Sequence, residues 1–287
     1  MSRIVFPSGR GLAVTRACVG IGSREDWDAV QDLRVTLRDP GVRSAGLFSI
    51  LLTAAQRSRW RPPEAVMSVL RAGRAHEELR VEAIERVWAD VLTGDPVIVL
   101  RGTALAYGAY DEPVLRHRHD LDLLVAGRPG TMIHDCGFPI VRHVSLFRAP
   151  LYAARLDDVV DDAVPVVIAG VPAMSLHPAD AVVHICAHVV THGRTASPAW
   201  AIDLVTLVRS QPGLEWQRVV GRAREWNVAP AVAPLVAWAV QELGMPVPAP
   251  AQAELDLVAR RAGPVHRLRL RSARAVGSTR RLGVSRA

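Results

Sequence analysis

The sequence contains no lysine, only three cysteines and no apolar run as long as a membrane-spanning helix. Cys18, Cys136 and Cys186 lie far apart and lack a C-x-x-C spacing, which argues against a disulfide framework and against a thiolate zinc site. A membrane helix needs about 20 apolar residues, and residues 1–11 lack the apolar core of a signal peptide. These absences predict a globular protein of the cytoplasm that has no membrane partner.

Positive charge is concentrated at the C-terminal end of the chain. The net charge is +7, and no acidic residue follows Asp256. The basic residues beyond that point leave the rest of the chain with a net charge of about −2. They are Arg260, Arg261, Arg267, Arg269, Arg271, Arg274, Arg280, Arg281 and Arg286. Blocks of like charge are often solvated, so we predict that residues 251–287 form a basic, partly disordered tail.

Length and apolar content set the size of the fold. With 287 residues, 49% of them hydrophobic, the chain can bury a large core and form one compact unit of two lobes. Helical periodicity predicts a mainly helical N-terminal region over 1–94, although weak alternation in residues 1–24 predicts a strand or two there. We predict an α/β core over 95–171, where the period becomes that of strands, and a helical lobe over 172–250.

Two aspartates stand at alternate positions of a predicted strand, in the segment HDLDLLV at residues 119–125. Side chains at alternate strand positions point to the same face, so Asp120 and Asp122 disfavour each other's ionisation unless they share a cation. A strand end whose acids face water or pair with Arg116 and Arg118 would show the same pattern. The sequence before the aspartates helps to distinguish these two interpretations.

A Gly-Thr turn precedes the aspartates, between a strand predicted at 97–101 and a short helix. Gly102 and Thr103 would offer backbone N–H groups, a hydroxyl and the positive end of the helix dipole, which together suit a phosphate. Two carboxylates suit Mg²⁺, which is usually held by one or two carboxylates together with substrate phosphates. This combination indicates nucleotidyl transfer, in which metal ions activate the attacking oxygen and stabilise the leaving pyrophosphate.

The segment that joins these features resembles the uncharacterised nucleotidyltransferases of the DNA polymerase β-like superfamily. The matching residues are Leu100, Arg101, Gly102, Ala104, Leu105, Tyr107, Arg116, Asp120, Leu121, Asp122, Leu123, Leu124 and Val125. Residues 175–193 are similar to a helical segment of the family, and the resemblance covers roughly residues 75–245. It implies an α+β fold: a small mixed β-sheet packed with helices, plus a helical C-terminal lobe, with the active site in the cleft between them.

The resemblance also implies a role for individual residues. Asp120 and Asp122 would be the catalytic acids and would hold Mg²⁺ or Mn²⁺, with an NTP as the substrate. The residues expected to bind the substrate are Gly102, Thr103, Arg101, Arg116 and His188.

Two positions depart from the family pattern. Arg101 stands where lysine is usual, which keeps the charge but changes the hydrogen-bonding geometry. Superfamily members commonly carry a third carboxylate on a later strand, and the nearest counterpart here, HVSLFRA at residues 143–149, has Ser145 in the acidic position. Asp157 is the alternative source of a third ligand. The expected metal site therefore depends on two acids.

Three histidines recur at intervals of four residues, at His184, His188 and His192, and form one stripe on a helix. Such a stripe can chelate a metal, but the sequence offers no third ligand of the H-E-x-x-H type. We therefore favour a polar stripe that faces the cleft or hydrogen-bonds a buried partner such as Asp203. The tryptophans of the helical lobe are predicted to be core residues rather than stacking platforms for a base. They are Trp200, Trp216, Trp226 and Trp238.

Three functional classes remain open from the sequence. The first is a metal-dependent enzyme that transfers a nucleoside monophosphate from an NTP to a small molecule, a peptide or RNA. The second is a nucleotide-binding protein on the same scaffold with weak or no turnover, which Ser145 supports. The third is a nucleic-acid-binding module that acts through the arginine-rich tail. The paired aspartates favour the first class.

Overall fold

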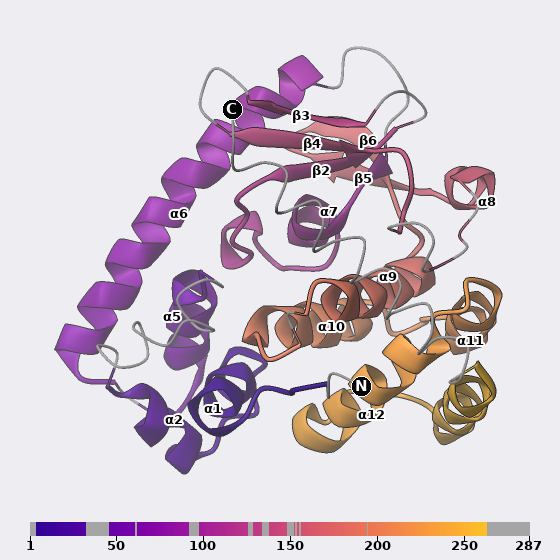
Figure 1. Ribbon diagram of the computed structural model, residues 1–287. Helices are drawn as coiled ribbons and strands as arrows, with labels where there is room; N and C mark the ends of the chain where they lie inside the picture. Colours follow the sequence, from indigo (N-terminus) through magenta and orange to yellow (C-terminus); the bar gives the residue numbers. More distant parts are fainter. Residues whose placement is uncertain are drawn as a thin grey trace, which may run out of the picture.

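The computed structural model describes residues 4–32, 46–60, 62–91, 98–125, 129–133, 138–147, 152, 154, 156–193 and 195–262. Within these residues a six-stranded mixed sheet has the order β3-β4-β2-β1-β6-β5 and lies at one end of the molecule (Figure 1). The strands are β1 (Ile98–Val99), β2 (Leu121–Leu124), β3 (Gly130–Ile133), β4 (Pro139–His143), β5 (Val164–Ile168) and β6 (Val171–Ser175).

The strand that carries Asp122 lies inside the sheet. β2 pairs antiparallel with β1 and parallel with β4. Its register places Asp122 beside Val141 and Leu124 beside His143, so the Asp122 and His143 side chains point to the same face. The strand begins at Leu121, so the expectation that both aspartates lie within one strand is wrong for Asp120.

Helices cover the sheet and form the rest of the molecule. The longest one in Figure 1, α6, runs along one side from α5 to the sheet, and α9 and α10 lie between the sheet and α12. The α-helices are α1 (Gly9–Cys18), α2 (Arg24–Val30), α5 (Phe48–Arg57), α6 (Glu64–Val91), α7 (Arg101–Gly108), α8 (Leu156–Asp161), α9 (Pro178–Thr191), α10 (Pro198–Ser210), α11 (Trp216–Glu225) and α12 (Ala229–Leu243), and a 3-10 helix, η1, covers Pro113–Leu115. A further helix covers residues 249–262.

Two clusters of buried apolar side chains hold these elements together. The smaller one packs Trp88 of α6 against the sheet. The larger one lies mainly among the helices, where Trp200, Trp216 and Trp226 are buried and the partly buried Trp238 packs against them, as predicted. The arrangement confirms the predicted α+β fold with a mixed sheet and a helical lobe. No helix among the described residues combines the length and the apolar character needed to cross a membrane.

Two regions differ from the sequence-based expectations. Residues 9–18, predicted as part of a strand, form helix α1, because Ala13, Val14 and Ala17 place apolar side chains on its buried face. Helix 249–262 includes the first residues of the predicted tail, so that part of the tail is folded. Residues 263–287 lie outside the described residues, and the division of the chain into four regions stays a prediction.

We expect the Leu255→Ala substitution to lower the free energy of unfolding by about 2–5 kcal/mol, the usual cost of truncating a buried leucine. Leu255 lies in helix 249–262 and is 1% exposed. Leu257 of the same helix is 40% exposed, so Leu257→Ala should change that free energy by less than about 0.5 kcal/mol. Urea unfolding of both variants measures the difference. Equal effects would show that this helix does not pack on the core.

Candidate functional site

A cavity of about 880 Å³ opens between the sheet and helices α9 and α10. Its walls include the first turns of α7, residues before and within β2, the end of β4, and one side of α9 and α10. Of the seven site residues predicted from the sequence, all except Thr103 line it. They are Arg101, Gly102, Arg116, Asp120, Asp122 and His188. The fold therefore brings residues from distant parts of the chain into one cleft.

The first turn of α7, which contains the Gly102 and Thr103 that the sequence placed before the helix, has an unusual backbone. Arg101, the first residue of α7, has a φ of 48°, a left-handed conformation that is uncommon for residues other than glycine. A Cβ atom at Gly102 would lie 3.3 Å from Cγ of Arg118, so a larger residue would crowd the turn. The hydroxyl of Thr103 is buried and makes no hydrogen bond within the described residues. A phosphate in the cleft would therefore meet backbone N–H groups at this turn rather than the threonine side chain.

The chain itself supplies a positive partner for Asp122. Oδ1 of Asp122 accepts hydrogen bonds from Nη2 of Arg101 and, at 2.7 Å, from Nε2 of His143. Nη1 of Arg101 lies 2.8 Å from Nδ1 of His188. Burial would raise the pKa of Asp122, but the hydrogen bond from His143 and the charge of Arg101 outweigh it and lower the pKa. Asp122 is therefore ionised, and Arg101 provides the cation that the sequence pattern called for.

Sequence reasoning missed His143, although it lies beside Asp122 in the cleft. The sequence pattern that could have pointed to His143 is the strand PIVRH at residues 139–143, in which alternation puts Val141 and His143 on one face. The pairing of that strand with β2 could not be read from its own sequence. On the face of the sheet that carries Asp122, the neighbouring strand thus presents an imidazole, not a third carboxylate.

The positions proposed for a third acid lie outside the cleft. Ser145 follows the end of β4, and its hydroxyl donates to the carbonyl of Phe147 at 2.6 Å. Asp157 is exposed on α8. Neither residue lines the cavity. The two aspartates therefore remain the carboxylates of the candidate metal site.

Arg116 is held by an ion pair with helix α10. Its Nε donates to Oδ1 of Asp203 at 2.6 Å, and its Nη2 donates to Oδ2 at 2.9 Å. Its Nη1 donates to the carbonyl of His117, so all three nitrogens are engaged within the chain. The hydroxyl of Tyr110 donates to Asp203 at 2.7 Å. Asp203 thus binds Arg116 and Tyr110, whereas the sequence suggested a histidine partner, and the contact of Arg116 with substrate stays a prediction.

The three histidines of α9 lie in different environments. His188 and His192 line the cleft, and their rings stack with centroids 4.0 Å apart. His184 is buried, and burial lowers its pKa to about 3, so its imidazole is neutral at physiological pH. Across the described part of the chain, no group of three or more His, Cys, Asp or Glu side chains could hold a metal ion. The stripe therefore faces the cleft through His188 and His192.

The donors present in the cleft fit a divalent ion that arrives with its substrate. Asp120 is 34% exposed at its side chain, and its Oδ2 lies 3.9 Å from Nε2 of His119. Asp120 and Asp122 both line the cavity, but two carboxylates leave most of the octahedral shell of Mg²⁺ open. Phosphate oxygens and water would complete that shell. The donor set is thus suited to a metal bound together with a triphosphate.

Part of the chain is similar to a known protein family. No curated protein and no solved structure matches the chain. The segment that matches the family begins after Asp122 and contains His143, His188 and Asp203, whereas the first turn of α7 lies before it. Residues 131–244, less than half of the chain, match the model of the family described as uncharacterised nucleotidyltransferase, which confirms the resemblance found in the sequence.

Proposed function

We propose that this protein is a metal-dependent nucleotidyltransferase, which transfers a nucleoside monophosphate from an NTP to an acceptor. One observation carries the proposal: the turn at Arg101 and Gly102 and the two aspartates line the same cleft. The match of residues 131–244 to an uncharacterised nucleotidyltransferase family supports the same reaction class. The cleft volume of about 880 Å³ lies within the range of small-molecule sites and suits a nucleotide.

The first turn of α7 supports binding of the triphosphate. Its unpaired N–H groups and the positive end of its dipole favour an anion, and Gly102 lets a phosphate approach the backbone closely. Arg101 adds a fixed positive charge at the same place. In the proposed complex the guanidinium of Arg101 exchanges part of its contact with Asp122 for a phosphate oxygen. The chain would thus keep its own cation beside Asp122 until the substrate arrives.

The carboxylates would take the metal when Arg101 makes that exchange. Mg²⁺ or Mn²⁺, held by Asp120 and Asp122 together with the phosphates, would neutralise phosphate charge and activate the attacking oxygen. His143 and His188 would keep their positions at the edge of the site through their contacts with Asp122 and Arg101. Arg116 would act through Asp203, by fixing the loop before β2 to α10. These roles assign binding and positioning to residues that line one cleft.

A nucleotide-binding protein with weak turnover is the second candidate, and it is favoured because the described residues of β4 place no carboxylate beside Asp122. Ser145 lies outside the cleft, and the side chain of β4 that contacts Asp122 is the imidazole of His143. An ion held by too few anionic ligands has low occupancy and cannot lower the pKa of an acceptor hydroxyl effectively. A role of the arginine-rich tail, residues 251–287, in nucleic-acid binding stays a prediction, because most of its arginines lie beyond residue 262, outside the described residues.

Thermal unfolding in the presence of each NTP, with and without Mg²⁺, tests the proposal. We expect one or more NTPs to raise the unfolding temperature when Mg²⁺ is present, because a ligand that binds the folded state stabilises it by mass action. Chelation of the metal should remove most of the increase. Pyrophosphate release in the presence of candidate acceptors then separates the transferase from the weakly active binder. Equal protection of wild type and the double variant Asp120→Asn/Asp122→Asn would rule out the assigned site.

A further inference from the structure

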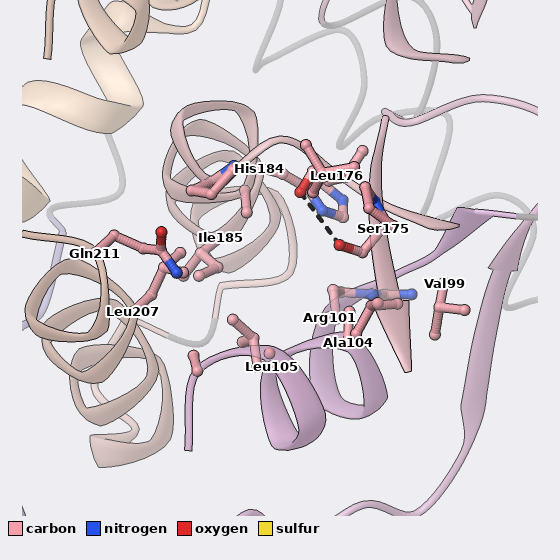
Figure 2. Close-up of a pocket in the computed structure, with 17 residues that line it drawn as sticks. Val99, Arg101, Ala104, Leu105, Ser175, Leu176, His184, Ile185, Leu207 and Gln211 are labelled. Carbon is pink, nitrogen blue, oxygen red and sulfur yellow. Dashed lines mark hydrogen bonds between the residues drawn. The ribbon is translucent and has the colours of Figure 1, made fainter. Parts of the chain in front are cut away.

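A second cavity, of about 320 Å³, borders the nucleotide cleft. It lies among α7, strands β5 and β6, and helices α9 and α10. Figure 2 shows Leu105, Ile185 and Leu207 turned toward one another in one part of this space, while Arg101 lies beside Ser175 and Val99 in another. Arg101, Leu105 and Ile185 also line the larger cleft, so these three side chains form a wall between the two cavities.

The small cavity has a different chemistry from the cleft beside it. Most of the described side chains around it are apolar, and no carboxylate is among them. Arg101, at the shared wall, carries the formal charge there, because the buried His184 is neutral with a pKa of about 3. The side-chain amide of Gln211 lines the space and makes no hydrogen bond to the described residues. Ser175 and His184 are the other polar side chains of the lining, so such a space would hold an uncharged, mainly apolar group with few polar contacts.

Small residues keep this space open. Ala104, Gly108 and Ala109 of the α7 region and Ala181 of α9 line it, at positions where larger apolar side chains would fill the gap. The pocket is partly open to solvent, and its volume of about 320 Å³ lies at the small end of the range of ligand pockets. An occupant of one ring or one short branched chain would fit it.

We infer that the small cavity binds the apolar body of the acceptor, and that the acceptor is a small, uncharged alcohol or phenol. This inference rests on the proposed nucleotidyl transfer. The shared wall at Arg101 places an occupant of the cavity next to the residue that holds Asp122, which is where the α-phosphorus of the NTP would lie. A charged acceptor would lose its hydration among these apolar side chains without gaining an ionic partner, apart from the engaged Arg101.

The reaction balances without any further reactant. The hydroxyl oxygen of the acceptor forms a bond to the α-phosphorus, and the bond from that phosphorus to the bridging oxygen of pyrophosphate breaks. The hydroxyl proton passes to water, and pyrophosphate leaves with the electron pair of the broken bond. The product is a phosphodiester of the acceptor and the nucleoside.

Binding of 4-methylphenol to the full-length protein tests the inference without any nucleotide. We expect saturable binding by calorimetry, and we expect Ala181→Phe to weaken it by about tenfold or more, because the added ring fills the cavity. Ala181→Leu should weaken it by a smaller factor, which keeps the test valid if the larger substitution disturbs folding. Ala199→Phe is the matched control, because Ala199 lines the nucleotide cleft and not the small cavity.

The two variants should give opposite results in two measurements. Ala181→Phe should lose 4-methylphenol and keep Mg²⁺-NTP protection, whereas Ala199→Phe should keep 4-methylphenol and lose NTP protection. Loss of NTP protection in Ala181→Phe would show that the cavity holds the nucleobase, which overturns the inference. Absence of saturable binding, or binding that neither Ala181 variant changes, would overturn it as well. Cavity-dependent binding without any NTP protection in wild type would instead refute the proposed transferase while the ligand site stands.

Discussion

Replacing Asp122 by asparagine is expected to abolish Mg²⁺-NTP protection and to lower turnover by about 100-fold or more, the scale seen when one preorganised electrostatic contact to a transition state is removed. Asp122 is 8% exposed at its side chain and pairs with Arg101, whose side chain is 19% exposed. Asparagine keeps the shape but leaves the guanidinium of Arg101 without its anion. We therefore also expect a loss of about 3 kcal/mol in the free energy of unfolding, the lower end for breaking a buried pair.

Asp120→Asn is the matched control for that substitution. Asp120 lines the same cleft, but its described ion pair is an exposed contact with His119 at 3.9 Å. Exposed pairs contribute about 0–1 kcal/mol, so this variant should lose nucleotide binding while its stability stays near that of wild type. An Asp122→Asn variant that binds Mg²⁺-NTP as wild type does would show that the metal site lies elsewhere.

The difference in the free energy of unfolding between wild type and Asp122→Asn should decrease as the pH falls. The pKa of Asp122 is lower in the folded state than its ordinary value, so the folded state favours the ionised form. The contribution of Asp122 to the free energy of unfolding is therefore complete above its unfolded pKa of about 3.9. It is lost as the pH falls through the lower pKa of the folded state. Urea unfolding of both proteins between neutral and strongly acidic pH measures this, and a difference that grows as the pH falls would contradict the ion pair.

Replacing Asp203 by asparagine is expected to lower the free energy of unfolding by about 3 kcal/mol, the lower end for breaking a buried pair, because it leaves the partly buried guanidinium of Arg116 without its anion. Asp203 is 5% exposed and receives hydrogen bonds from two nitrogens of Arg116 and from the hydroxyl of Tyr110. The pair joins the loop before β2 to α10, so its loss should also loosen the wall of the cleft. Chemical denaturation measures the effect.

Two control variants separate burial from charge in that result. Tyr110→Phe removes one neutral donor from Asp203 and should cost about 1 kcal/mol. Asp111→Asn breaks the ion pair with Arg57, in which both side chains are at least 67% exposed, and should cost no more than about 1 kcal/mol. If Asp203→Asn costs as little as Asp111→Asn, the pair of Arg116 and Asp203 does not hold the cleft together.

The local pattern of the sequence determined much of the fold. The predicted short helix appears as α7, although it begins at Arg101 and so includes the Gly-Thr pair that was expected to precede it. Helices follow where apolar residues recur at helical spacing in the C-terminal half. Those features depend on neighbours within about one turn of helix or two strand positions, which a single sequence carries. The strand predicted near the N-terminus is wrong for residues 9–18, because this short apolar stretch fits both periods and only its burial against other helices favours α1.

The tertiary structure determined which charged side chains contact each other. The sequence located Asp120, Asp122 and Arg101, yet it suggested Arg116 or Arg118 as partners of the aspartates and a histidine as partner of Asp203. Arg101 and Asp122 are 21 residues apart and Arg116 and Asp203 are 87 apart, and strand pairing and helix packing bring each pair together. His143 enters the site through the parallel pairing of β2 with β4, and the small cavity arises where α7, β5, β6, α9 and α10 meet. Local periodicity carries no information on contacts between distant segments, because those contacts depend on how whole elements pack.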